Sequence, residues 1–148
     1  MTVDIKVKAS VEDRKALDKI EKTLQIKDGH YQVALPWCND PSDLPNNKQI
    51  AERRLRFLKN RLTKDSKLLK KYTATMEDYI TKGYAKKTPM DELTSGDRPV
   101  WYLPHHPVTH PNKPQKVRVV FDCAAEYQGT SLNKQLLQGS DLSNPFVG

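Results

Sequence analysis

Residues 48–83 read KQIAERRLRFLKNRLTKDSKLLKKYTATMEDYITKG, and this stretch decides the helical part of the fold. Its first half places apolar residues at helical spacing, at Ala51, Leu55, Leu58 and Leu62. Its second half repeats the pattern at Leu68, Leu69, Tyr72, Met76, Tyr79 and Ile80. We expect Asp65 to cap the second helix and Gly83 to end it. The stretch therefore predicts two amphipathic helices joined at residues 63–65 in an antiparallel helical hairpin.

The preceding residues predict one more helix and a short strand. Ser10 followed by Asp13 is a capping-box variant that opens a helix. An apolar stripe follows at Leu17, Ile20 and Leu24. Gly29 is suited to end this helix with a left-handed backbone, and residues 31–35 alternate as in a strand. Residues 36–47 form a loop rich in proline and asparagine. The next helix has two candidate N-caps, Asn46 and Asn47.

After the helical stretch the sequence changes to short extended pieces and turns. The pattern predicts a short strand or an extended piece at residues 84–87. It also predicts one helical turn at residues 88–93 and a tight turn at residues 95–97. Residues 100–103 predict a strand, and KVRVVFD at residues 116–122 is the strongest strand signal in the chain. We expect these two strands to pair antiparallel across the proline-rich loop between them.

These elements predict the α+β fold class. Helices within residues 10–83 should pack beside a small antiparallel sheet within residues 84–122. The chain has 148 residues, of which 36% are hydrophobic, so it is long enough for one domain with a modest core.

The positive charge of the chain is concentrated in one block. Residues 48–87 hold thirteen Lys or Arg and four Asp or Glu, net +9, whereas residues 1–47 and 88–148 are each net −1. A solvated helix face is one interpretation. With only four acidic residues in the block, most of its cations have no acidic ion-pair partner one helical turn away. This imbalance favours a polyanion as the binding partner, and nucleic acid is the first candidate. The candidate contacts to a nucleic-acid backbone are Arg53, Arg54, Lys59 and Arg61.

Arg118 lies between two valines on the strongest strand, so its side chain faces opposite to theirs. One interpretation is an exposed ion pair between Arg118 and Asp122, which share that face. The other is an arginine held on a rigid strand and aimed at a phosphate, whose oxygens match its planar fork.

Other chemistries are weakly supported. Three histidines lie in one loop, at His105, His106 and His110, but no cysteine is near them, which favours local hydrogen bonding over zinc. Cys38 and Cys123 are far apart and are expected to be reduced. No glycine-flanked nucleophile and no glycine-rich phosphate loop occurs. No apolar run has the length of a membrane span or of a signal core.

Several strings in their order resemble the reverse transcriptase region of BEL/Pao-type long-terminal-repeat retrotransposons. The strings are GHYQVALPW at residues 29–37, LPNNKQIAERRLRFLKNRL at residues 44–62, YITKGYAKK at residues 79–87 and VWYLPHHPVTHPNKPQKVRVVFDCAAEYQGTSLNKQLLQG at residues 100–139. The last of these is similar to the fingers hairpin of the family. The resemblance covers the chain from about residue 10 onward, and it implies an incomplete polymerase fold.

The resemblance implies roles for individual residues. Arg118 matches the strand arginine that holds the triphosphate of the incoming nucleotide, and Asp122 matches the aspartate that closes that strand. Asn133 matches the asparagine of the leucine-asparagine pair that follows. Lys113 and Lys116 are both candidates for the fingers lysine that binds phosphate. No catalytic residue and no metal ligand is assigned here, because the two Mg²⁺ ions of a complete polymerase are held by palm aspartates and no tyrosine-any-Asp-Asp string occurs.

The resemblance also implies an organisation and a function. Residues 1–47 would be a pre-polymerase connector with a helix and a short strand, residues 48–83 a basic helical hairpin, and residues 84–148 partial reverse transcriptase fingers ending before the palm. The parent protein would carry out RNA-directed DNA synthesis, and this chain would bind template-primer and deoxynucleoside triphosphate without catalysis. Its partners would be nucleic acid, the nucleotide and the rest of the polyprotein, with no membrane. Its location would be intracellular, in the cytoplasm or a virus-like particle, and not secreted. The alternatives are a non-enzymatic, basic nucleic-acid-binding or interaction module derived from a transposon, and an inactive relic.

Overall fold

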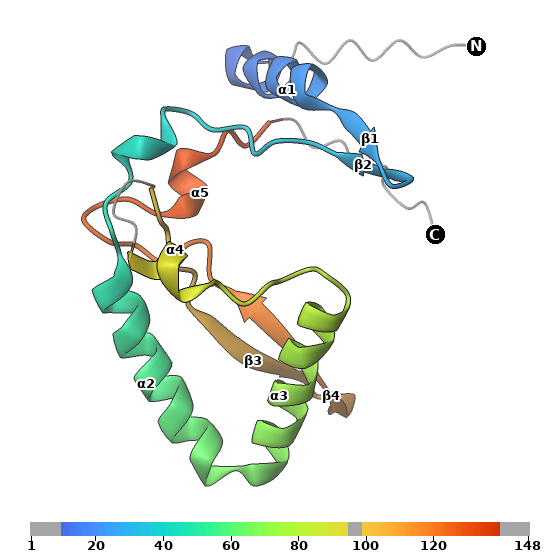
Figure 1. Cartoon of the computed structure of the whole chain (residues 1–148), viewed down its shortest axis with the longest axis vertical. Helices are drawn as coiled ribbons and strands as arrows, with labels where there is room; N and C mark the ends of the chain where they lie inside the picture. The colour runs from blue at the N-terminus through green and yellow to red at the C-terminus, as the bar shows by residue number, and fades with distance from the viewer. Residues whose placement is uncertain (1–9, 95–98, 140–148) are drawn as a thin grey trace. The chain divides into compact units, whose positions relative to one another are not determined.

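The structure is a computed structural model that describes residues 10–94 and 99–139, drawn in Figure 1. The chain divides into two compact units. One consists of Met1–Asp40 with Lys134–Gly148, and the other of Pro41–Asn133. The described part is mixed α and β, with five α-helices and two small antiparallel sheets, so the predicted fold class is confirmed at this level.

The first unit contains helix α1, Val11–Thr23, and a hairpin of β1, Gln25–Lys27, with β2, His30–Gln32. The predicted capping box is confirmed, because the Asp13 N–H donates to Ser10 Oγ at 3.0 Å and the Ser10 N–H to Asp13 Oδ2 at 2.9 Å. The prediction that Gly29 ends the helix is wrong. Asp28 and Gly29 both have positive φ, 51° and 75°, and form the two-residue turn of the hairpin.

A backbone pairing closes the first unit. Trp37 forms an isolated antiparallel bridge with Leu136. The Cys38 N–H donates to the Gln135 carbonyl at 2.7 Å, and the Leu137 N–H donates to the Pro36 carbonyl at 2.8 Å. The predicted loop at residues 36–47 is therefore partly paired, and it also contains the short 3₁₀ helix η1, Pro41–Asp43.

The second unit is built on helices α2, Lys48–Lys64, and α3, Ser66–Thr81, which diverge from their joint in Figure 1. The predicted joint is confirmed, since Asp65 Oδ1 accepts from the Leu68 N–H at 2.9 Å and caps α3. Gly83 has a φ of 74° and ends α3 in a Schellman motif. In that motif the Gly83 N–H donates to the Ile80 carbonyl and the Tyr84 N–H to the Tyr79 carbonyl.

The residues after α3 are less regular than predicted. Of the two alternatives for residues 84–87, the strand is wrong, because no strand forms there. The predicted helical turn is present as α4, Met90–Thr94. The turn predicted at residues 95–97 lies outside the described residues.

The sheet of the second unit is a hairpin of β3, His105–His110, and β4, Lys113–Phe121. The prediction of a strand at residues 100–103 is wrong, and the partner of β4 comes from the segment predicted as a proline-rich loop. Tyr102 does not pair in the sheet because its N–H and carbonyl both bond the side chain of Asn47. Pro107 is tolerated in β3 because each strand of a two-stranded sheet has a free edge.

The core of the second unit joins both helices to the hairpin. Its buried residues are Leu58, Leu62, Tyr72 and Val119. The predicted alternation on β4 holds at its centre, where Val119 is buried and Arg118 and Val120 are exposed. The predicted apolar face of α3 supplies Leu68, Met76 and Tyr79, which pack against this cluster. Outside the core many large apolar side chains stay exposed, among them Phe57 at 69% and Tyr84 at 77%.

The last described helix is α5, Leu132–Gln135. Within the described ranges, no helix combines the length and the apolar character that a membrane crossing requires.

Candidate phosphate and nucleic-acid interface

A hollow on the β3–β4 hairpin gathers the three residues that the sequence assigned to phosphate binding. We call it the basic hollow, and it has a volume of about 280 Å³. It is lined by Val108, Thr109, His110, Pro111, Lys113, Lys116 and Arg118. Two lysines, an arginine and a histidine therefore face one space, and none of the described residues that line it is acidic.

An irregularity in the strand pairing brings these side chains together. Thr109 pairs with Val117, but the next residue, His110, pairs with Lys113, so residues 114–116 bulge out of the ladder. In a regular strand Lys113 and Arg118 would point to opposite faces. The bulge breaks that alternation, and Lys113 reaches the same hollow as Arg118.

Arg118 has no ion-pair partner among the residues that the structure describes. The interpretation of an exposed Arg118–Asp122 pair is wrong, because Asp122 Oδ2 contacts Arg54 Nη2 at 2.9 Å. Arg118 sits opposite Val108 in the ladder and is exposed. Its guanidinium is therefore free to meet a phosphate group from solution.

Arg54 and Asp122, both candidates from the sequence, are joined to each other. Their side chains are 39% and 25% exposed, and the pair connects α2 to the end of β4. Asp122 also anchors the chain at this point, because its N–H donates to the Pro104 carbonyl at 2.8 Å and its Oδ1 accepts from the Ala124 N–H at 3.2 Å. These contacts give both residues a structural role.

Asn133 contributes through its backbone. Its N–H donates to the Cys123 carbonyl at 3.0 Å and closes the loop of residues 123–133. Its side chain is exposed. The residue that the resemblance assigns to the fingers therefore fixes the end of this loop.

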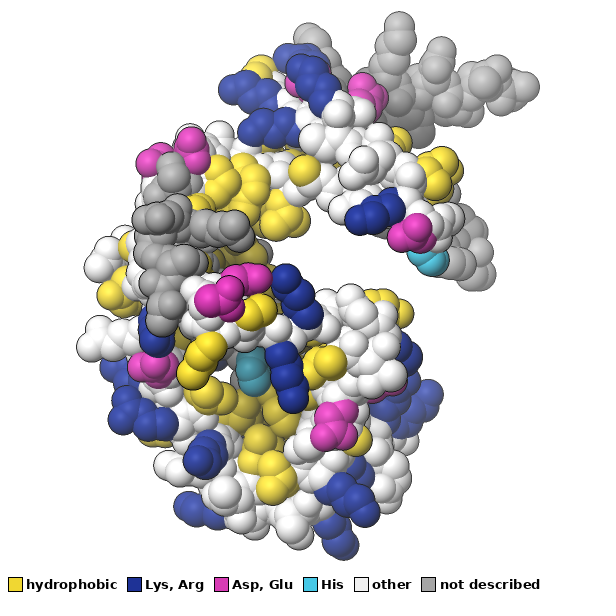
Figure 2. Space-filling view, in the orientation of Figure 1, with side chains coloured by type: hydrophobic (Ala, Val, Ile, Leu, Met, Phe, Trp, Pro, Cys, Tyr) yellow, Lys and Arg dark blue, Asp and Glu magenta, His cyan; other side chains and the backbone are white. Residues whose placement is uncertain are grey.

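The basic block covers the surface of α2, the joint and the start of α3, where Figure 2 shows dark-blue side chains. Within residues 10–94 and 99–139, eight of its cations have no ion-pair partner: Arg53, Arg56, Lys59, Arg61, Lys64, Lys67, Lys70 and Lys87. Of the predicted backbone contacts, Arg53, Lys59 and Arg61 belong to this group and are exposed. These three differ from Arg54, which is engaged in the pair with Asp122.

The sequence did not single out Arg56 and Tyr127 as site residues. Together with Gln49, Ile50 and Arg53 they line a second hollow of about 230 Å³, which we call the Tyr127 hollow. The spacing of Arg53 and Arg56, three residues apart on a helix, is a signal for adjacent side chains. No local signal places Tyr127 beside them, because it follows Arg56 by 71 positions in the sequence.

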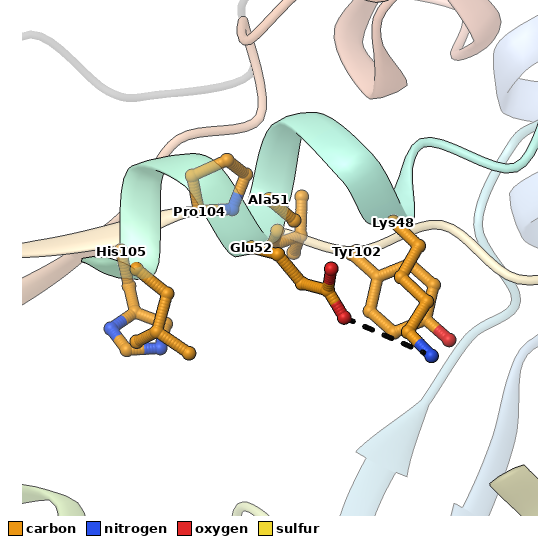
Figure 3. A pocket seen from close by; sticks show the side chains of 8 residues that line it. Lys48, Ala51, Glu52, Tyr102, Pro104 and His105 are labelled. Atoms are coloured by element: carbon orange, nitrogen blue, oxygen red, sulfur yellow. Dashed lines mark ion pairs between the residues drawn. The ribbon is translucent and has the colours of Figure 1, made fainter. Parts of the chain in front are cut away.

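A third, more apolar hollow of about 250 Å³ lies where α2 meets the residues before β3, and Figure 3 shows it from close by. Lys48 and Glu52 form an ion pair of 3.8 Å at its edge, beside Tyr102. His105 lines it and stacks on Tyr72, with ring centroids 5.9 Å apart, and its Nδ1 hydrogen-bonds the Tyr72 hydroxyl.

Burial controls the protonation of this stacked pair. It raises the pKa of Tyr72 to about 12. Burial and, second, the nearby His106 lower the pKa of His105 below its ordinary value. Both rings are therefore neutral near pH 7, which fits a packing role. His110, the third predicted loop histidine, accepts the Asn112 N–H at 3.1 Å through Nδ1.

In the described part of the chain, no three His, Cys, Asp or Glu side chains lie close enough to hold a metal ion. Cys38 and Cys123 are free thiols.

Comparison with protein families, with curated proteins and with solved structures found no match to this chain.

Proposed function

We propose that this chain is the fingers part of a retrotransposon RNA-directed DNA polymerase, and that its basic hollow binds the phosphate groups of an incoming nucleotide. The observation that supports this most is the convergence of Lys113, Lys116 and Arg118 on one hollow without an acidic residue. Three cations that repel one another lower their energy when a polyanion lies between them.

The three side chains suit a triphosphate for different reasons. Arg118 offers a planar fork that gives two parallel hydrogen bonds to phosphate oxygens. The two lysines are flexible point charges that follow the position of the outer phosphates. Arg118 projects from the regular part of a paired strand, so little backbone entropy is lost when it meets the ligand.

The basic block on α2 and α3 would hold the template-primer. Its exposed and unpaired cations supply backbone contacts that do not depend on base sequence. The binding of nucleotide phosphate and the binding of nucleic acid are then assigned to different surfaces of the second unit.

The test is the binding of thymidine triphosphate to the purified chain, followed through the backbone amide resonances of β3 and β4. We expect Arg118→Ala to weaken binding by roughly 10- to 100-fold, because charged hydrogen bonds contribute about 1.5–3 kcal/mol. Arg118→Lys should recover only part of the loss, since a point charge lacks the fork.

A matched control removes the same charge elsewhere. The variant Lys113→Gln/Lys116→Gln/Arg118→Gln should lose binding. The variant Arg14→Gln/Lys15→Gln/Lys27→Gln takes three exposed cations from the first unit and should keep it. Equal losses in both variants would show a general charge effect and overturn the assignment of the hollow. A chain that binds nucleic acid but no triphosphate would favour the non-enzymatic basic module instead.

A further inference from the structure

The Tyr127 hollow is separate from the basic hollow and shares no residue with it. Gln49, Arg53 and Arg56 come from α2, and Tyr127 comes from the loop that closes at Asn133. The three α2 residues are exposed, and Tyr127 is half-buried. An aromatic ring and two guanidinium groups thus share one small concave surface.

The backbone that carries Tyr127 is held in place. Its N–H donates to the Thr130 carbonyl at 2.8 Å, and the Thr130 N–H donates back at 3.1 Å. Gln128 and Gly129 between them have positive φ, 49° and 79°, as a tight two-residue turn requires. Buried Ala125 and Ser131 flank this turn. The ring is therefore presented from an ordered backbone, which reduces the entropy lost on binding.

Within the described part of the chain, the ring of this hollow forms no aromatic stack and its two arginines form no ion pair. Among the described residues, Tyr127 stacks on no other aromatic ring. Arg53 and Arg56 have no ion-pair partner there, and no acidic residue lines the hollow. Their spacing of three residues makes the two guanidinium groups neighbours on the helix surface.

A nucleotide with an exposed base has the complementary chemistry. Its base presents an aromatic face to a tyrosine ring, and its phosphate accepts hydrogen bonds from arginine. In a duplex both faces of a base are covered by its neighbours, so only an unstacked base reaches such a ring. Phosphate contacts alone give no preference for single strands, whereas an aromatic ring does.

We propose that the Tyr127 hollow binds one unstacked nucleotide of a single-stranded nucleic acid, with its base on the Tyr127 ring and its phosphate between Arg53 and Arg56. This proposal rests on the nucleic-acid binding proposed above and adds to it a preference for single strands. The ligand class is a single-stranded nucleic acid without sequence preference, because every base offers an aromatic face.

The test compares two fluorescein-labelled oligomers of equal length, a thymidine oligonucleotide of about twelve nucleotides and its abasic counterpart with the same phosphates. Fluorescence anisotropy at about 50 mM salt gives the two affinities. The wild-type chain should bind the thymidine oligomer more tightly. Tyr127→Ala should weaken that binding by roughly 5- to 150-fold, the loss of one stacking contact, and leave the abasic affinity unchanged.

Three further variants separate the parts of the hollow. Tyr127→Phe keeps the ring and should bind like wild type. Arg53→Gln/Arg56→Gln should weaken both oligomers, because phosphate contacts are lost in each. Tyr31→Ala removes a tyrosine that is 80% exposed in the first unit and should change neither affinity.

A measurement on the wild-type chain tests the contact without a variant. The ring protons of Tyr127 should shift on addition of the thymidine oligomer and not on addition of the abasic one. Tyr127 resonances that respond equally to both oligomers, or a Tyr127→Ala variant with unchanged affinity for both, would overturn the stacking proposal while phosphate binding stands. If the wild-type chain binds neither oligomer, nucleic-acid binding itself is refuted.

Discussion

Replacing Asn47 by alanine should destabilise the second unit more than any exposed substitution on α2. Asn47 is 0% exposed, and its side chain makes two hydrogen bonds to one residue far away in the sequence. Its Nδ2 donates to the Tyr102 carbonyl at 2.8 Å, and its Oδ1 accepts from the Tyr102 N–H at 2.7 Å. The Asn47 side chain thus satisfies the backbone N–H and carbonyl of Tyr102, which a neighbouring strand would otherwise bond, just before the chain enters β3.

The magnitude follows from the groups left behind. Asn47→Ala leaves the Tyr102 N–H and carbonyl without partners, at about 1–3 kcal/mol for each buried group. Some entry of water reduces this, so we expect a loss of about 2–5 kcal/mol in the free energy of unfolding. That is a large part of the ~5–15 kcal/mol that stabilises an ordinary domain. Asn47→Asp should be at least as harmful, because it aims a carboxylate oxygen at the Tyr102 carbonyl.

The neighbouring residue supplies the control. Asn46 precedes the N-cap of α2 and is exposed, and its Oδ1 accepts the Lys48 N–H at 3.0 Å, so Asn46→Ala should cost about 0.5–1 kcal/mol as one lost local hydrogen bond. Urea unfolding followed by helical circular dichroism gives both free energies. Hydrogen exchange of the Tyr102 amide gives a local readout, and its protection should fall sharply only in Asn47→Ala. If the two variants are equally mild and the amide stays protected, the bridging role of Asn47 is refuted.

The Arg54–Asp122 pair should show a coupling of about 0.5–1 kcal/mol in a double-mutant cycle of alanine variants, because it is partly exposed; zero coupling would mean that it does not tie α2 to β4. Arg54→Ala should also weaken nucleic-acid binding less than Arg53→Ala does. Because folding lowers the pKa of His105, this side chain is protonated in the unfolded chain before it is protonated in the folded chain as the pH falls below ~6.5. Stability should therefore fall from about pH 7.5 to pH 5, and His105→Phe should flatten that dependence; an unchanged slope would exclude His105 as its source. Binding of nucleic acid by the basic block should follow a log–log salt slope of roughly −3 to −5 if about five phosphates are contacted, and reversing Arg53, Lys59 and Arg61 to glutamate should abolish it. Binding that survives this reversal would assign it to another surface.

Elements that depend on neighbouring residues could be predicted from the sequence. Asp65 caps α3 because its carboxylate reaches an amide three positions on, and Gly83 ends the helix because it adopts a positive φ without a steric cost. The capping box of α1 is local in the same sense. The strand at β4 also follows from its own β-branched residues. The charge of the basic block was likewise evident, because it is a property of composition, whereas Lys113 and Lys116 became candidates only through the sequence resemblance.

Contacts between residues distant in the sequence could not be predicted, because they form only when the helices and the hairpin pack together. Residues 100–103 have the composition of a strand, but the Asn47 side chain takes the backbone groups of Tyr102, and β3 forms from the histidine and proline segment instead. Asp122 has a cation on its own strand face, yet Arg54 from α2 lies closer. The bulge at residues 114–116 brings Lys113 beside Arg118, and the loop of Tyr127 brings an aromatic ring beside two α2 arginines. Rules of capping and periodicity act within a few residues, whereas these pairings depend on which buried polar groups and charges find partners once the helices and the hairpin pack.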